Sequence, residues 1–152
     1  MKVFCLCLIL VVVGCLATTM PCSLQLAMKT MDLQNATCCV CCRQSKLAGT
    51  CVGNGLVVVC NFADLPSVLQ QSKCVDGISL HFDGNLQKFH HVVQKLQVEV
   101  YCTQQIGGAI VLVGHSKQIA GGVQVDGRLV NVQMAFANGK ISVGSPLLLC
   151  DY

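Results

Sequence analysis

The 152-residue sequence contains few charged side chains and very few carboxylates. The 10 lysine and arginine residues are scattered, so no basic cluster is present to bind nucleic acid or an anionic membrane surface. Glu99 is the only glutamate, so the paired carboxylates of a glycoside hydrolase have no candidate. The nucleophile motif G-x-S-x-G and a phosphate-binding loop are also missing. We therefore expect a protein that is not an enzyme, has no cofactor and does not bind nucleic acid.

The N-terminus has a basic residue followed by an uncharged apolar run over residues 3–17. That run is shorter than the roughly 20 residues that span a bilayer, and small residues end it, which is typical of a secretory signal peptide. We predict a signal peptide over 1–17 with cleavage after Ala17. A cut near Met20 and a lipoprotein box ending at Cys15 are the alternatives. No later segment predicts a membrane span, so the mature chain is expected to be secreted and extracellular.

Cysteine is abundant, with 13 residues in the chain. Removal of the predicted leader leaves an even number, as is typical of an oxidised secreted protein held by disulfide bonds. The pairing cannot be deduced from the sequence. The cysteines predicted to form disulfides are Cys22, Cys38, Cys39, Cys41, Cys42, Cys51, Cys60, Cys74, Cys102 and Cys150.

Four of these cysteines lie within five positions, in the stretch T-C-C-V-C-C-R at 37–43. The two overlapping C-x-x-C spacings could bind zinc together with Cys51 and Cys60, or act in redox chemistry. Because the secretory pathway is oxidising, we favour disulfides in which each cysteine pairs outward. The sequon Asn35-Ala36-Thr37 directly precedes the cluster and predicts a surface loop with an N-linked glycan on Asn35.

The periodicity predicts a mainly β fold, an antiparallel sheet or sandwich with a disulfide-rich N-terminal segment. We expect a cysteine-rich segment over 18–73, with a short helix in 23–34, and an antiparallel β domain over 74–152. Asp126-Gly127 and Asn138-Gly139 separate alternating apolar runs and predict two hairpins. The predicted strands cover about 55–62, 78–82, 96–100, 109–113, 123–125, 129–136 and 140–143.

Residues 86–97 are ambiguous. Leu86, Phe89, Val93 and Leu96 fit a helical stripe, but they lie between two strand signals. We favour a loop followed by a strand, with a helix as the alternative.

The histidines and the Asp-Gly pairs offer no metal site. His81, His90, His91 and His115 lack zinc-binding spacings and are interpreted as surface or loop residues. Asp76-Gly77 and Asp83-Gly84 bracket one strand; two carboxylates are too few for calcium, and they are interpreted as turns.

Residues 74–145 resemble a shortened von Willebrand factor type D domain. The family's opening strand and F-D-G turn match Cys74, Phe82, Asp83 and Gly84, and its V-x-V-[ND]-G motif matches Val123, Val125, Asp126 and Gly127. The family's closing cysteine motif is missing, so its calcium binding and assembly are not carried over. Residues 51–85 more weakly resemble the N-terminal cysteine cap of leucine-rich repeats, through Cys51, Val58, Cys60, Leu65 and Pro66.

The sequence thus predicts a secreted, disulfide-stabilised, non-catalytic binding or structural protein whose partner is an extracellular protein. One alternative is a defence protein that inhibits a protease by inserting residues 43–50, with Arg43 or Lys46 as the anchor. The other is a carrier that encloses an apolar ligand.

Overall fold

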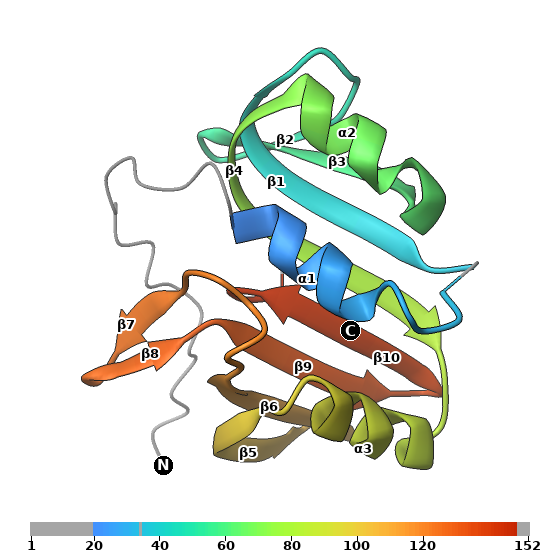
Figure 1. Ribbon diagram of the computed structural model, residues 1–152, viewed down its shortest axis with the longest axis vertical. Coiled ribbons are helices and arrows are strands. Elements are labelled where there is room, and N and C mark those ends of the chain that lie inside the picture. The colour runs from blue at the N-terminus through green and yellow to red at the C-terminus, as the bar shows by residue number, and fades with distance from the viewer. Residues whose placement is uncertain (1–19, 34, 149–152) are drawn as a thin grey trace.

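A computed structural model describes residues 20–33 and 35–148 of the chain. One antiparallel sheet has the strand order β2-β3-β1-β4-β10-β9-β6-β5, and β7 and β8 form a separate hairpin (Figure 1). The strands are β1 (Thr37–Ser45), β2 (Thr50–Val52), β3 (Gly55–Asn61), β4 (Ser72–Asp83), β5 (Glu99–Ile106), β6 (Ala109–His115), β7 (Val123–Val125), β8 (Arg128–Val130), β9 (Val132–Ala137) and β10 (Lys140–Ser145).

Helices cover one face of this sheet (Figure 1). They are α1 (Met20–Met28), α2 (Leu65–Gln71, preceded by the short 3-10 helix η1, Phe62–Asp64) and α3 (Leu86–Lys95). The prediction of a mainly β, antiparallel fold is confirmed. The helices form a second layer that packs on one face of the sheet. Within the described residues, no helix has the length and apolar content needed to cross a membrane. The predicted signal peptide lies outside the described residues.

Strand β4 joins the two predicted segments of the chain. It pairs with β1 along one edge, where Leu80 lies opposite Cys38, and with β10 along the other, where Leu80 lies opposite Val143. The predicted boundary at residue 74 falls inside this strand, at Cys74, which has a positive φ of 53°. Residues from both sides of the boundary therefore contribute to one sheet.

Both predicted hairpins form. Asp126 and Gly127 have φ values of 48° and 76°, and Asn138 and Gly139 have values of 50° and 75°. Two consecutive positive φ angles define the type I′ turn, whose twist matches that of the flanking strands. These turns join β7 to β8 and β9 to β10.

The preferred interpretation of residues 86–97 as a loop and a strand is wrong, because residues Leu86–Lys95 form α3. The side chain of Asn85 accepts a hydrogen bond from the backbone N–H of Lys88 at 2.8 Å and caps the helix. Phe89 and Val92 are buried on the face turned toward the sheet. The following strand begins only at Glu99, since Leu96 is the C-terminal cap of the helix.

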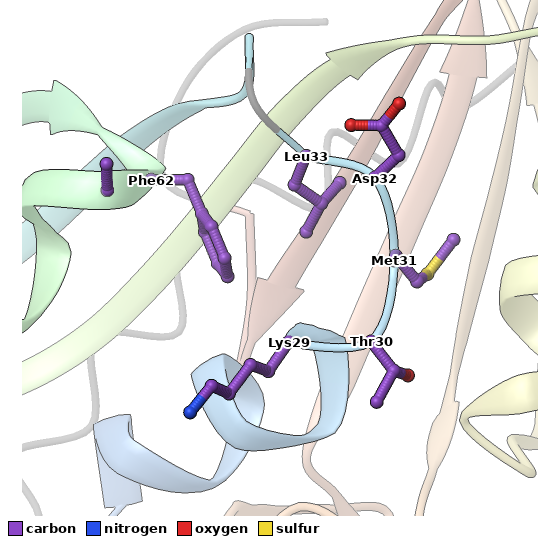
Figure 2. Close-up of a pocket in the computed structure, with 7 residues that line it drawn as sticks. Lys29, Thr30, Met31, Asp32, Leu33 and Phe62 are labelled. Atoms are coloured by element: carbon purple, nitrogen blue, oxygen red, sulfur yellow. The ribbon is translucent and has the colours of Figure 1, made fainter.

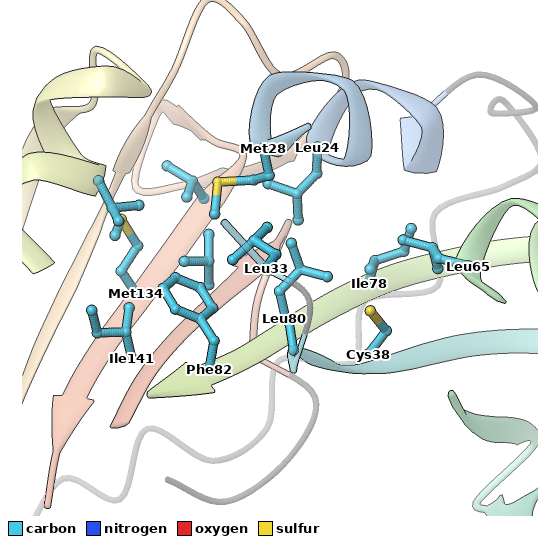
Figure 3. Packing of buried hydrophobic residues seen from close by; sticks show 14 of the residues in the cluster. Leu24, Met28, Leu33, Cys38, Leu65, Ile78, Leu80, Phe82, Met134 and Ile141 are labelled. Carbon is cyan, nitrogen blue, oxygen red and sulfur yellow. The ribbon is translucent and has the colours of Figure 1, made fainter. Parts of the chain in front are cut away.

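The main core lies between the helices and the sheet. Figure 3 shows Leu24 and Met28 of α1 directed toward Leu80 of β4, with Met134 and Ile141 of the neighbouring strands in the same cluster. Each of these five side chains is fully buried. Burying one such side chain contributes about 1.5–3 kcal/mol, so this layer is the principal source of stability.

The opposite face of the sheet carries a smaller apolar cluster. Ala109, Val111, Ala135 and Ala137 are buried there and pack with Leu148. The chain after β10 crosses close to the sheet, since a Cβ atom on Gly144 would lie 2.4 Å from the carbonyl oxygen of Leu147. Glycine is required at this position because no side chain fits beneath the crossing segment.

Candidate functional site

The four clustered cysteines lie in the middle of β1, and the strand divides them between the two faces of the sheet. Cys38 and Cys42 belong to the core beneath the helices, and the alternation of a strand places Cys39 and Cys41 on the opposite face. Residues three apart in a strand point in opposite directions, so neither C-x-x-C spacing brings two thiols together. Among the described residues, no group of three or more histidine, cysteine, aspartate or glutamate side chains is placed to bind a metal ion.

Cys38 has one cysteine partner directly across the sheet. Its register partner in β3 is Cys60, and the Cys38 thiol donates a hydrogen bond to the Cys60 sulfur. The pKa of the Cys38 thiol is raised to about 12, mainly by burial and with smaller contributions from the neighbouring Cys60 and Cys39. Burial also raises the pKa of Cys60, with a contribution from the Asp64 carboxylate. Both thiols are therefore held protonated near neutral pH.

The other described cysteines are spread over the molecule. Cys42 is buried, and its thiol lies 3.7 Å from the backbone carbonyl of Leu56. Cys51, Cys74 and Cys102 are exposed on three different strands. The structure contains no disulfide bond among the eight cysteines whose side chains it describes. The predicted disulfides of this set therefore stay a prediction, and the side chains of Cys22 and Cys150 lie outside the description.

The loop proposed for protease insertion is shorter than the sequence indicates. Arg43 belongs to β1, and its guanidinium group lies 3.6 Å from the Asp76 carboxylate of β4. Only residues 46–49 connect β1 to β2, and the backbone N–H of Lys46 donates to the carbonyl of Gln71 at 3.2 Å. Arg43 is thus held within the sheet, and Lys46 is the basic residue left in the connection.

His81 differs from the surface residue that the sequence suggests. It lies in β4, half-buried on the face opposite the helices, and its Nδ1 atom is 2.9 Å from the hydroxyl oxygen of Ser142 in β10. Its Nε2 atom is buried without a hydrogen-bond partner. Burial lowers the pKa of the imidazole, and the nearby Lys140 ammonium group lowers it further. The strand alternation of Ile78, Leu80 and Phe82 is the sequence signal from which this position of His81, on the other face of the strand, could have been predicted.

This environment predicts a specific loss of stability in acid. The unfolded chain binds a proton at His81 near pH 6.5 and the folded chain binds it only at lower pH, so folding is disfavoured as the pH falls below about 6.5. We expect His81→Gln to reduce this decline in stability. The measurement is the urea midpoint of unfolding at pH values about one unit apart, from pH 5 to pH 8. The exposed His90→Gln variant is the control and should follow the wild type. An unchanged decline in His81→Gln would assign the acid sensitivity to another group.

Two hollows mark the surface of the cysteine-rich segment. The smaller, about 420 Å³, lies between the chain after α1 and η1; Figure 2 shows the Phe62 ring and the Leu33 side chain around it, with Lys29 on its rim. Asn35 of the sequon follows this stretch and is exposed in a turn, as predicted. The larger hollow, about 700 Å³, lies between β3, α2 and residues 47–48, and Cys60 and Asp64 line it.

The two edges of the sheet differ in length. Strand β2 has three residues, whereas β5 has eight and pairs only with β6 within the described part of the chain. Every residue of β5 except Tyr101 is exposed, including the apolar side chains of Val100 and Ile106. A bulge falls between Val100 and Cys102, and the Arg128 guanidinium group lies 5.2 Å from the centre of the Tyr101 ring. Residues 103–106 beyond this contact form a regular, uncovered edge.

Comparison with known proteins assigns no relative. No protein-family model matches the chain, and neither a curated protein nor a solved structure matches it. The resemblances to a von Willebrand factor type D domain over 74–145 and to a leucine-rich-repeat cap over 51–85 stay predictions from the sequence.

Proposed function

We propose that the protein is a secreted, non-catalytic binding protein that holds an extended segment of an extracellular protein partner along the β5 edge. The observation that carries the proposal is the length and exposure of β5, whose outer backbone N–H and C=O groups face away from the sheet. An added strand would satisfy these groups, and this is the mode of recognition in which peptides extend an existing sheet.

The composition of β5 supports this role over that of a protected edge. Natural proteins shield sheet edges with lysine, proline, short strands or bulges. The segment Thr103–Ile106 contains none of these, since its sequence is T-Q-Q-I and its register with β6 is regular. By contrast, β2 at the other edge is shielded by its three-residue length. The apolar side chain of Ile106 and the threonine and glutamine side chains provide contacts for a partner strand.

Secretion is supported by the apolar leader over residues 3–17 and by the exposed sequon at Asn35. The whole chain, expressed in a eukaryotic culture, is expected in the medium, and its retention inside the cells would contradict this part of the proposal.

The binding site is tested with a displayed library of random extended peptides. Hits are expected to protect the backbone amides of residues 102–106 from hydrogen exchange. The double variant Thr103→Lys and Gln105→Lys should weaken their affinity about tenfold, since two charged side chains must be desolvated beneath the added strand. The matched double variant Thr50→Lys and Val52→Lys in β2 should bind as the wild type does. A library without binders, or binders that protect other residues, would overturn the assignment to β5.

A further inference from the structure

We propose that Cys38 and Cys60 form a disulfide bond that joins β1 to β3 beneath α2, and that the Cys60 thiol is the first of the two to react. The inference deepens the proposed function, because a secreted protein folds in an oxidising compartment, but its geometric basis is independent of secretion.

The register of the sheet selects this pair. Cys38 and Cys60 are direct partners in antiparallel strands, a position at which Cα atoms lie about 4.5–5.5 Å apart. A disulfide bond requires about 4.4–6.8 Å between Cα atoms. Both side chains lie on the helix face and their thiols are hydrogen-bonded to each other. Bond formation therefore needs no rearrangement of the two strands.

The neighbouring cysteines do not compete for Cys38. Cys39 and Cys41 lie on the opposite face of β1. Cys42 is on the same face, but its partner in β3 is Leu56, and its thiol is directed at the Leu56 carbonyl. Cys51 in β2 is separated from β1 by the whole of β3. Among the described cysteines, Cys60 is the one that lies across from Cys38.

Unequal exposure of the two thiols sets the order of the reaction. Cys38 is fully buried, whereas Cys60 lines the larger hollow of about 700 Å³. The Cys60 thiol gives up its proton as its sulfur attacks a small disulfide such as oxidised glutathione, and the departing glutathione thiolate takes up a proton. The Cys38 thiol then gives up its proton as its sulfur attacks the Cys60 sulfur of the mixed disulfide, and the second glutathione thiolate leaves and is protonated. In sum, two protein thiols are oxidised, and one oxidised glutathione is reduced to two molecules of the thiol.

The experiment uses the purified, reduced and folded full chain, treated with oxidised glutathione and digested with trypsin. Cys38 is contained in the peptide 30–43 and Cys60 in the peptide 47–73, so their bond appears as a cross-link between these peptides that a reductant abolishes. Before that link appears, glutathione should be found on Cys60 and not on Cys38. The exposed Cys51, Cys74 and Cys102 are expected to react faster with a maleimide than Cys60.

Single variants separate this pair from the other cysteines of the same peptides. The cross-link should disappear in Cys60→Ser and in Cys38→Ala, and should persist in Cys51→Ser and in Cys39→Ala. Persistence in Cys60→Ser, or loss in Cys51→Ser, would overturn the proposed pair. If Cys38→Ala does not fold, the Cys60→Ser and Cys51→Ser comparison is sufficient, because those side chains are at least partly exposed. Since oxidation is performed on purified protein, a failure of secretion in culture leaves this result unaffected.

Discussion

The Phe89→Ala variant is expected to lose about 3–5 kcal/mol of the free energy of unfolding, the usual cost of removing a buried phenylalanine side chain. Phe89 is 1% exposed and belongs to the core cluster between α3 and the sheet. Its ring lies 5.9 Å from the ring of Phe136 in β9, measured between centroids. Removing the ring therefore leaves a cavity at the only contact between aromatic rings that the described residues make across the two layers.

The measurement is a urea titration followed by circular dichroism, with the redox state of the cysteines held constant. Leu86→Ala is the matched control, because Leu86 is on the same helix but is 42% exposed; it should cost less than about 1 kcal/mol. Phe89→Leu, which retains an apolar side chain, should fall between the two. Equal midpoints for Phe89→Ala and Leu86→Ala would mean that α3 does not pack on the sheet as described.

The same helix shows how far the sequence determines the fold. The stripe of Leu86, Phe89 and Leu96 was visible, and Asn85 is a good N-cap. The flanking strand signals favour a continued β-meander, and periodicity alone does not distinguish a helix from a strand in a short apolar run. Tertiary packing favours the helix here, because α3 covers the helix face of β6, β9 and β10. The Asp-Gly and Asn-Gly hairpins were predictable because they depend on local φ preferences.

The arrangement of the cysteine cluster depends on information that the sequence does not display. Its composition predicts disulfides in which each cysteine pairs outward, and the structure places all four cysteines in the interior of β1. A protonated cysteine behaves as a small hydrophobic residue, so a T-C-C-V-C-C-R stretch can fill a strand that is covered on both faces. Strand alternation then divides the thiols between the faces, and the partner of each depends on register with β3 and β4. Register arises from long-range pairing, which the sequence does not display.

Asn131 is a buried polar residue whose side chain makes three hydrogen bonds. It lies between β8 and β9, where the sequence indicated one continuous strand over 129–136. Its side-chain carbonyl accepts the Ser116 N–H at 2.7 Å, and its amide group donates to the carbonyls of Ser116 at 2.8 Å and Ile119 at 2.5 Å. The Ser116 hydroxyl in turn donates to the Leu96 carbonyl at 2.5 Å. The Asn131 amide thereby ties the chain after β6 to the β8–β9 junction, and the Ser116 hydroxyl ties the same chain to the end of α3.

Replacement of Asn131 by alanine should lower the free energy of unfolding by about 3–5 kcal/mol. Three buried backbone groups lose their partner at about 1–3 kcal/mol each, and losses within one network do not add fully. In Asn131→Asp, the carboxylate still accepts the hydrogen bond from the Ser116 N–H, but it cannot donate to the two carbonyl oxygens and is repelled by them. This variant should therefore be most unstable at neutral pH. It should partly recover in acid, where the protonated carboxyl group donates one hydrogen bond. Urea titrations at both pH values measure these effects, with the exposed Gln124→Ala as the control. If the stability of Asn131→Asp did not depend on pH and equalled that of Gln124→Ala, the proposed role of the network would be contradicted. The two hydrogen bonds that the Asn131 amide group donates would then contribute nothing to the stability of the folded state.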